Sequence, residues 1–146
     1  MTINKYTTCL VKDRSVKYPA ETANNAEAVK GIVCKLFRAD RLPSESIWML
    51  CTNTKLGAVA AFEVGAGGTG SCVVDVASIA RNALLTGAAG VVLAHNHPSG
   101  DVSPSGADID ATKRVWKALE MLDIRLLDHV IIGASGLYSF AESGLL

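Results

Sequence analysis

Apolar residues recur with helical spacing between residues 25 and 38, where they are separated by three and four positions. This spacing predicts an amphipathic helix, which the polar side chain of Asn24 or Asn25 can cap. A proline at position 43 ends the helical pattern. The residues expected to face the core are Val29, Ile32, Val33, Leu36 and Phe37.

The same spacing predicts two further helices. One follows Asp75, which can cap it, and ends at Gly87, a residue type that commonly terminates helices. The other begins near Ser105. The expected core residues are Val76, Ile79, Ala80, Ala83 and Leu84 in the former helix, and Ile109, Thr112, Val115, Trp116, Leu119 and Leu122 in the latter.

Short apolar runs bounded by turn residues predict strands. Residues 47–51 and 58–64 are separated by a turn sequence and are expected to form a hairpin. Other strands are expected at 7–12, 90–94, 126–132 and 137–140. Because helices alternate with strands while some strands pair as hairpins, the fold class is α/β with a mixed sheet.

Length and charge narrow the function classes. The 146 residues are expected to form a single domain, and the 14 basic and 14 acidic side chains cancel. Zero net charge disfavours a protein whose main partner is nucleic acid, although a local basic patch remains compatible with it.

Neither a membrane span nor a signal peptide is predicted. No run of about 18 apolar residues occurs, and the N-terminus is charged where a signal peptide is apolar. The four cysteines include no C-x-x-C pair, which indicates reduced thiols rather than a disulfide framework. A cytoplasmic location is therefore expected.

Two histidines follow the strand predicted at 90–94. Side chains alternate along a strand, so His95 and His97 are expected to point to the same side. Two imidazoles placed in this way suit a borderline metal ion such as Zn²⁺. The alternative is a pair of surface histidines at the end of a strand.

A third ligand is needed, and Asp101, Asp108 and Asp110 are within reach. Asp108 is best placed, because it falls in the first helical turn after Ser105 and that turn folds back toward the strand end. Asp110 points about 200° around the helix from Asp108, and Asp101 is the weaker candidate. Three protein ligands leave a position for water, as in catalytic zinc sites. The alternative role of Asp108 is to cap the helix together with Ser105.

These residues resemble the JAMM metalloprotease motif, also called MPN+ or JAB, in the form His95-x-His97-x₁₀-Asp108 with Ser105 before the aspartate. The longer string H-N-H-P-S-G-D-x-x-P-S-x-x-D is similar to that of the RadC family of bacterial JAB-domain proteins. So are the strings L-L-D-H-V-I-I-G near residue 130 and Y-S-F near residue 139. The resemblance covers residue 18 to the end, without the helix-hairpin-helix region that RadC-type proteins commonly carry before the JAB domain.

The resemblance implies a JAMM, cytidine-deaminase-like fold, in which helices flank a mixed sheet. It also implies zinc held by His95, His97 and Asp108. A glutamate that activates water is implied upstream, and Glu45, which precedes an apolar strand, takes that place. Glu63 on the following strand is the rival, and a solvated residue at a strand start is the other interpretation of Glu45.

The implied activity is that of a zinc metallopeptidase or isopeptidase, in which water activated by the metal attacks an amide carbonyl of a peptide or protein substrate. Ser105 would donate a hydrogen bond to the oxyanion. Two alternatives remain, a metal-binding protein of DNA repair (a nuclease or an accessory factor) and a JAB-fold interaction module without turnover. His129 is expected to be a structural histidine at a strand end, or else to line the substrate groove.

Overall fold

The computed structural model describes residues 3–5, 7–17, 22–67, 74–134 and 136–146. Their strands form one five-stranded sheet in the order β2-β1-β3-β4-β5. The β3–β4 pair is parallel and the other neighbouring pairs are antiparallel, so the sheet is mixed as predicted. The strands are β1 Ser46–Thr52, β2 Ala58–Ala66, β3 Gly90–Asn96, β4 Arg125–Ile132 and β5 Leu137–Ser139.

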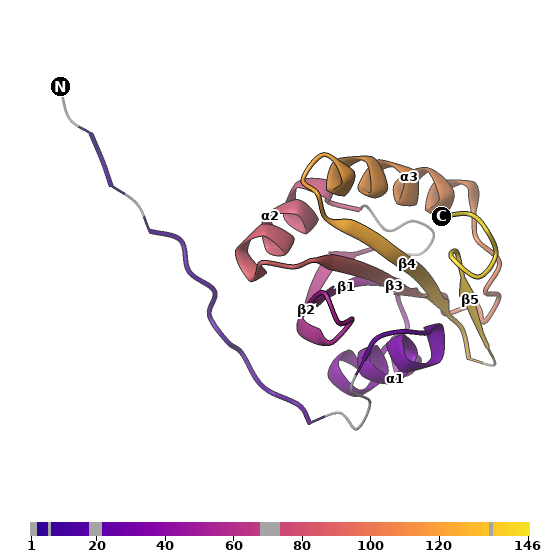
Figure 1. Cartoon of the computed structure of the whole chain (residues 1–146). Helices are drawn as coiled ribbons and strands as arrows, with labels where there is room; N and C mark the ends of the chain where they lie inside the picture. Colours follow the sequence, from indigo (N-terminus) through magenta and orange to yellow (C-terminus); the bar gives the residue numbers. More distant parts are fainter. Residues whose placement is uncertain (1–2, 6, 18–21, 68–73, 135) are drawn as a thin grey trace.

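Three α-helices cover the two faces of this sheet, with α1 on one side and α2 and α3 on the other (Figure 1). Asn25 caps the first helix, because its side chain accepts a hydrogen bond from the amide of Ala28 at 2.8 Å. Among the described residues, no helix combines the length and apolar character needed to cross a bilayer. The helices are α1 Ala26–Phe37, α2 Val76–Thr86 and α3 Gly106–Glu120, and a short 3-10 turn, η1 Ala39–Arg41, follows α1.

Successive residues of the central strands belong to two separate cores. Trp48 of β1 and Val92 of β3 pack on the α1 side, whereas Met49 and Leu93 pack on the side of α2 and α3. This division follows from the alternation of side chains along a strand. It also assigns a face to His95, which lies two residues beyond Leu93 and is therefore on the α2 and α3 side.

The structure contradicts two groups of sequence-based expectations. Residues 7–12 are exposed and form no strand, because no neighbouring strand provides hydrogen bonds for them. Leu84 and Trp116 were expected in the core but are 57% and 43% exposed, and Leu122 is 37% exposed. Each helix packs a narrow stripe against a single sheet, so apolar residues at the edges of the predicted faces contact solvent.

Gly133 allows the loop after β3 to lie against the end of β4. A Cβ atom at this position would come within 2.6 Å of Val102 Cγ1 and 2.7 Å of the Gly100 carbonyl oxygen. Gly133→Ala is therefore expected to lower the free energy of unfolding by about 1–3 kcal/mol, measured by urea denaturation. Gly136→Ala is the control, because a Cβ there meets no atom within 4 Å. Equal stability of the two variants would contradict the expected close approach.

Candidate metal centre

Three side chains converge where β3 ends. The Nε2 atoms of His95 and His97 are 2.9 Å apart, so the two rings do point to one side of the strand. Asp108 Oδ1 lies 3.4 Å from His95 Nε2, and Asp108 Oδ2 lies 3.7 Å from His97 Nε2. In the described part of the chain this is the group of His, Cys, Asp or Glu side chains whose arrangement can hold a metal ion.

The atoms and their spacing fit a divalent metal ion. Ligands of a tetrahedral zinc ion at about 2.0–2.1 Å lie about 3.3 Å from one another. The two histidine Nε2 atoms are 2.9 Å apart and His95 Nε2 is 3.4 Å from Asp108 Oδ1, values on either side of this distance. Two imidazole nitrogens and a carboxylate also form a common ligand set for zinc. The geometry therefore admits a metal ion without a rearrangement of the backbone.

A capping box fixes Asp108 in the cluster. Ser105 caps α3, and its amide and hydroxyl both donate hydrogen bonds to Asp108 Oδ2, at 2.8 and 2.6 Å. The other oxygen, Oδ1, faces His95. The capping interpretation of Asp108 is confirmed, and it is compatible with a role as metal ligand, because the same carboxylate approaches the histidines.

The other nearby aspartates lie outside the cluster. The side chain of Asp101 accepts a hydrogen bond from the amide of Ser103 at 2.9 Å, so the idea that this carboxylate is a ligand is not supported. Its backbone carbonyl instead accepts a hydrogen bond from His97 Nδ1 at 2.6 Å. This bond leaves the lone pair of a neutral His97 ring on Nε2, toward the cluster. Asp110 is exposed on α3.

The register of the sheet separates the two candidate glutamates. Ile47 pairs with His95, and extending this antiparallel register by two residues brings Glu45 opposite His97, on the same face. Glu63 instead pairs with Trp48, whose side chain lies in the core on the α1 side. This extended register favours Glu45 as the carboxylate near the histidines, whereas Glu63 lies on the opposite face of the sheet.

Asn96 holds the segment that carries Glu45. It lies between the two histidines in the sequence and is 2% exposed. Its side chain accepts a hydrogen bond from the amide of Ser46 at 2.8 Å and donates one to the carbonyl of Ser44 at 3.0 Å. This role of Asn96 was not predicted from the sequence, although its position between two histidines of a buried strand could have indicated it.

His129 lies behind His95 and is 1% exposed, so the suggestion that it lines a substrate groove is wrong. Its Nε2 atom is 2.8 Å from His95 Nδ1, and its Nδ1 atom is 2.6 Å from Thr112 Oγ1. Its ring also stacks on Phe140, with centroids 4.9 Å apart. His129 is therefore a buried partner of His95, reached through the parallel pairing of β3 with β4.

Burial perturbs both inner histidines. It lowers the pKa of His95 from the ordinary 6.5 to about 4, with the charge of Asp108 opposing the shift and that of His97 adding to it. Burial also lowers the pKa of His129, and the charges of His95 and His97 act in the same direction. Both rings are consequently neutral at pH 7.

Acidification is expected to destabilise the metal-free protein. The unfolded chain binds a proton on His95 near pH 6.5, whereas the folded chain binds it only near pH 4. The stabilisation present above pH 6.5 is therefore lost as the pH falls toward 4, with a contribution from His95 of roughly 3 kcal/mol. Urea denaturation with a chelator present, repeated across this range, measures the effect. His95→Gln should reduce the slope, and an equal slope in both proteins would contradict the assignment.

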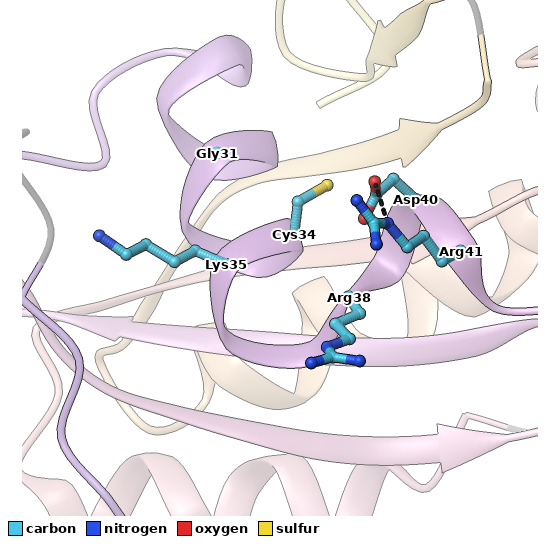
Figure 2. Close-up of a pocket in the computed structure, with 6 residues that line it drawn as sticks. All are labelled: Gly31, Cys34, Lys35, Arg38, Asp40 and Arg41. Carbon is cyan, nitrogen blue, oxygen red and sulfur yellow. Dashed lines mark ion pairs between the residues drawn. The ribbon is translucent and has the colours of Figure 1, made fainter.

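A second group of polar side chains lines a hollow at the end of α1 (Figure 2). Lys35, Arg38 and Arg41 are basic, and Arg41 Nε lies 3.5 Å from Asp40 Oδ2. Burial and the charge of Asp40 raise the pKa of Cys34, which lines the same hollow. Because α1 covers the opposite face of the sheet, this basic group is separate from the histidine cluster.

Known proteins are similar to most of this chain. A curated UPF0758 protein of Flavobacterium johnsoniae is 39% identical over 104 residues, which are 71% of this chain and 45% of the relative. The UPF0758 protein YfjY of Escherichia coli K12 is 45% identical over 105 residues, 72% of this chain and 66% of the relative. A UPF0758 protein of Porphyromonas gingivalis is 44% identical over 106 residues, 72% of this chain and 47% of the relative.

This chain thus spans about half to two thirds of the length of these relatives. The family model of the RadC-like JAB domain matches residues 23–145, which include every strand of the sheet and all three α-helices. The matched range also contains the histidine pair, Asp108 and Glu45. The chain therefore belongs to the family of RadC-like JAB domains.

Proposed function

We propose that this domain is a metal-dependent hydrolase that cleaves an amide bond of a peptide or protein, with zinc as its metal ion. The observation that carries the proposal is the convergence of His95, His97 and Asp108 where β3 ends. A Zn²⁺ ion held by these three side chains would supply Lewis acidity toward a carbonyl group and toward water.

Glu45 is the proposed general base. Its carboxylate would take a proton from the attacking water and deliver that proton to the departing amine nitrogen as the C–N bond breaks. Two observations support this role: the antiparallel register pairs Ile47, two residues after Glu45, with His95, and the side chain of Asn96 bonds to the backbone on either side of Glu45. A positioned base of this kind typically contributes about 10²–10⁴-fold to the rate.

Ser105 is the proposed donor to the oxyanion. Its hydroxyl donates to Asp108 Oδ2, so the hydroxyl would have to rotate toward the substrate to take this role. The backbone amide of Ser105 donates to the same oxygen and would keep Asp108 in place during that rotation. One such donor stabilises a transition state by about 3 kcal/mol.

Zinc binding and cleavage can be tested separately on the purified chain. Equilibrium dialysis against Zn²⁺ measures the number of ions bound, and a peptide library analysed by mass spectrometry measures cleavage with and without a chelator. Binding of about one ion together with chelator-sensitive cleavage supports the proposal. Stoichiometric binding without cleavage of any peptide would favour an interaction module instead, and metal-dependent cleavage of DNA would favour the nuclease alternative.

A further inference from the structure

A continuous chain of hydrogen bonds runs from His95 into the interior. His95 Nδ1 lies 2.8 Å from His129 Nε2, and His129 Nδ1 lies 2.6 Å from Thr112 Oγ1. Thr112 Oγ1 in turn lies 2.6 Å from the backbone carbonyl oxygen of Asp108. This series of hydrogen bonds therefore begins at the ring of His95 and ends at the backbone of Asp108, and both residues belong to the candidate metal centre.

The contact between Thr112 and Asp108 determines which group donates and which accepts in every hydrogen bond of this series. A carbonyl oxygen has no proton, so the hydroxyl of Thr112 must donate to Asp108, because two oxygens 2.6 Å apart would otherwise repel each other. A hydroxyl has a single proton, so Thr112 can only accept from His129. A neutral His129 that carries its proton on Nδ1 has its lone pair on Nε2 and accepts from His95 Nδ1.

We infer that Thr112 and His129 fix the proton of His95 on Nδ1, and thereby keep the Nε2 lone pair of His95 directed at the metal position. The inference rests on the proposed metal site and adds two positioning residues to it. With the proton of His95 on Nδ1, the lone pairs of His95 Nε2 and His97 Nε2 face each other at 2.9 Å, and a cation bound between them relieves their repulsion. In the opposite tautomer a proton on Nε2 would donate to His97 and would occupy the position where a metal ion has to bind.

The residues of this series of hydrogen bonds are buried. Thr112 is 2% exposed and His129 is 1% exposed, so water has no access to replace a missing partner. His129 also touches no carboxylate in the described structure, and its backbone amide, rather than its ring, bonds to Asp128. A charged His129 ring would therefore be buried without a compensating negative charge, so the ring is neutral and has one proton. Because that proton is donated to Thr112, the other ring nitrogen can only accept a hydrogen bond from His95.

The matched pair Thr112→Val and Thr112→Ser tests the inference. Valine keeps the shape of the side chain but removes the oxygen that accepts from His129, whereas serine keeps this oxygen. The affinity for Zn²⁺, measured by competition with a chromophoric chelator, is expected to fall about 10- to 100-fold in Thr112→Val and to stay within about twofold in Thr112→Ser. Affinities equal to the wild type in both variants, or an equal loss in both, would overturn the inference.

Nitrogen NMR of the metal-free wild-type protein gives a second test that needs no substitution. The imidazole nitrogens report directly which one carries the proton, and we expect Nδ1–H for both His95 and His129. A predominant Nε2–H form of His95 would overturn the inference. Neither readout involves turnover, so a chain that binds Zn²⁺ with the expected tautomers but cleaves no peptide would refute the proposed hydrolase and leave this assignment intact.

Discussion

Glu45→Gln is expected to leave zinc binding unchanged and to reduce the rate of peptide cleavage by about 10²–10⁴-fold. Glutamine has nearly the same shape as glutamate but cannot accept a proton from water. The backbone around residue 45 should stay in place, because Asn96 bonds to Ser44 and Ser46 through its own side chain. Dialysis against Zn²⁺ measures the binding, and the initial rate of cleavage of a library-derived peptide measures the loss.

Glu63→Gln is the matched control for this experiment. Glu63 pairs with Trp48 on the α1 side of the sheet, so its substitution is expected to change the rate by less than about twofold. Full activity of Glu45→Gln with normal metal content would refute the role of Glu45. Loss of activity in Glu63→Gln alone would show that the register argument had selected the wrong carboxylate.

Asp108→Ala should have the second large effect, because it removes a metal ligand and half of a capping box at once. Loss of a residue that merely supports a ligand weakens metal binding by about 10- to 100-fold, and loss of the ligand itself should exceed this. The free energy of unfolding of the metal-free protein should fall by about 1 kcal/mol, since Ser105 loses its partner at the start of α3. Zinc competition and urea denaturation measure the two effects.

Asp110→Ala and Ser105→Ala separate the two roles of Asp108. Asp110 lies on the same helix but is exposed, so its substitution should change neither the zinc affinity nor the free energy of unfolding. Ser105→Ala removes the hydroxyl but keeps the backbone amide that donates to Asp108, so it should destabilise the protein while leaving most of the zinc affinity. Full zinc affinity in Asp108→Ala would exclude this carboxylate as a ligand.

The parts of the site that depend on local sequence could be predicted. Alternation along a strand was sufficient to place His95 and His97 on one side, and the first turn of α3 was sufficient to bring Asp108 toward them. The strands and helices between residues 25 and 140 were likewise found, apart from their exact ends. These features involve residues close in sequence, for which backbone geometry alone determines the neighbours.

The remaining features depend on contacts between distant segments. His129 reaches His95 because β4 lies parallel to β3, and Thr112 reaches His129 because α3 packs over β4. The distinction between Glu45 and Glu63 required the register of β1 with its neighbours, including the irregularity between residues 47 and 48. Hydrophobic patterning indicates which face of a strand is buried, but it does not by itself select the partner strand, the exact register or the helix that covers the strand.

The hydrogen bonds of Asn96 bear on how far the length of the connection between α1 and β1 can change. Because its amide group holds the backbone at Ser44 and Ser46 directly, the position of Glu45 relative to the histidines is determined by two adjacent strand ends. The length of the connection from α1 to β1 therefore does not affect this position. Insertions between Arg41 and Ser44, after the buried Ala39 of η1, would thus alter the outline of the surface near the site while leaving the spacing of its reactive groups unchanged.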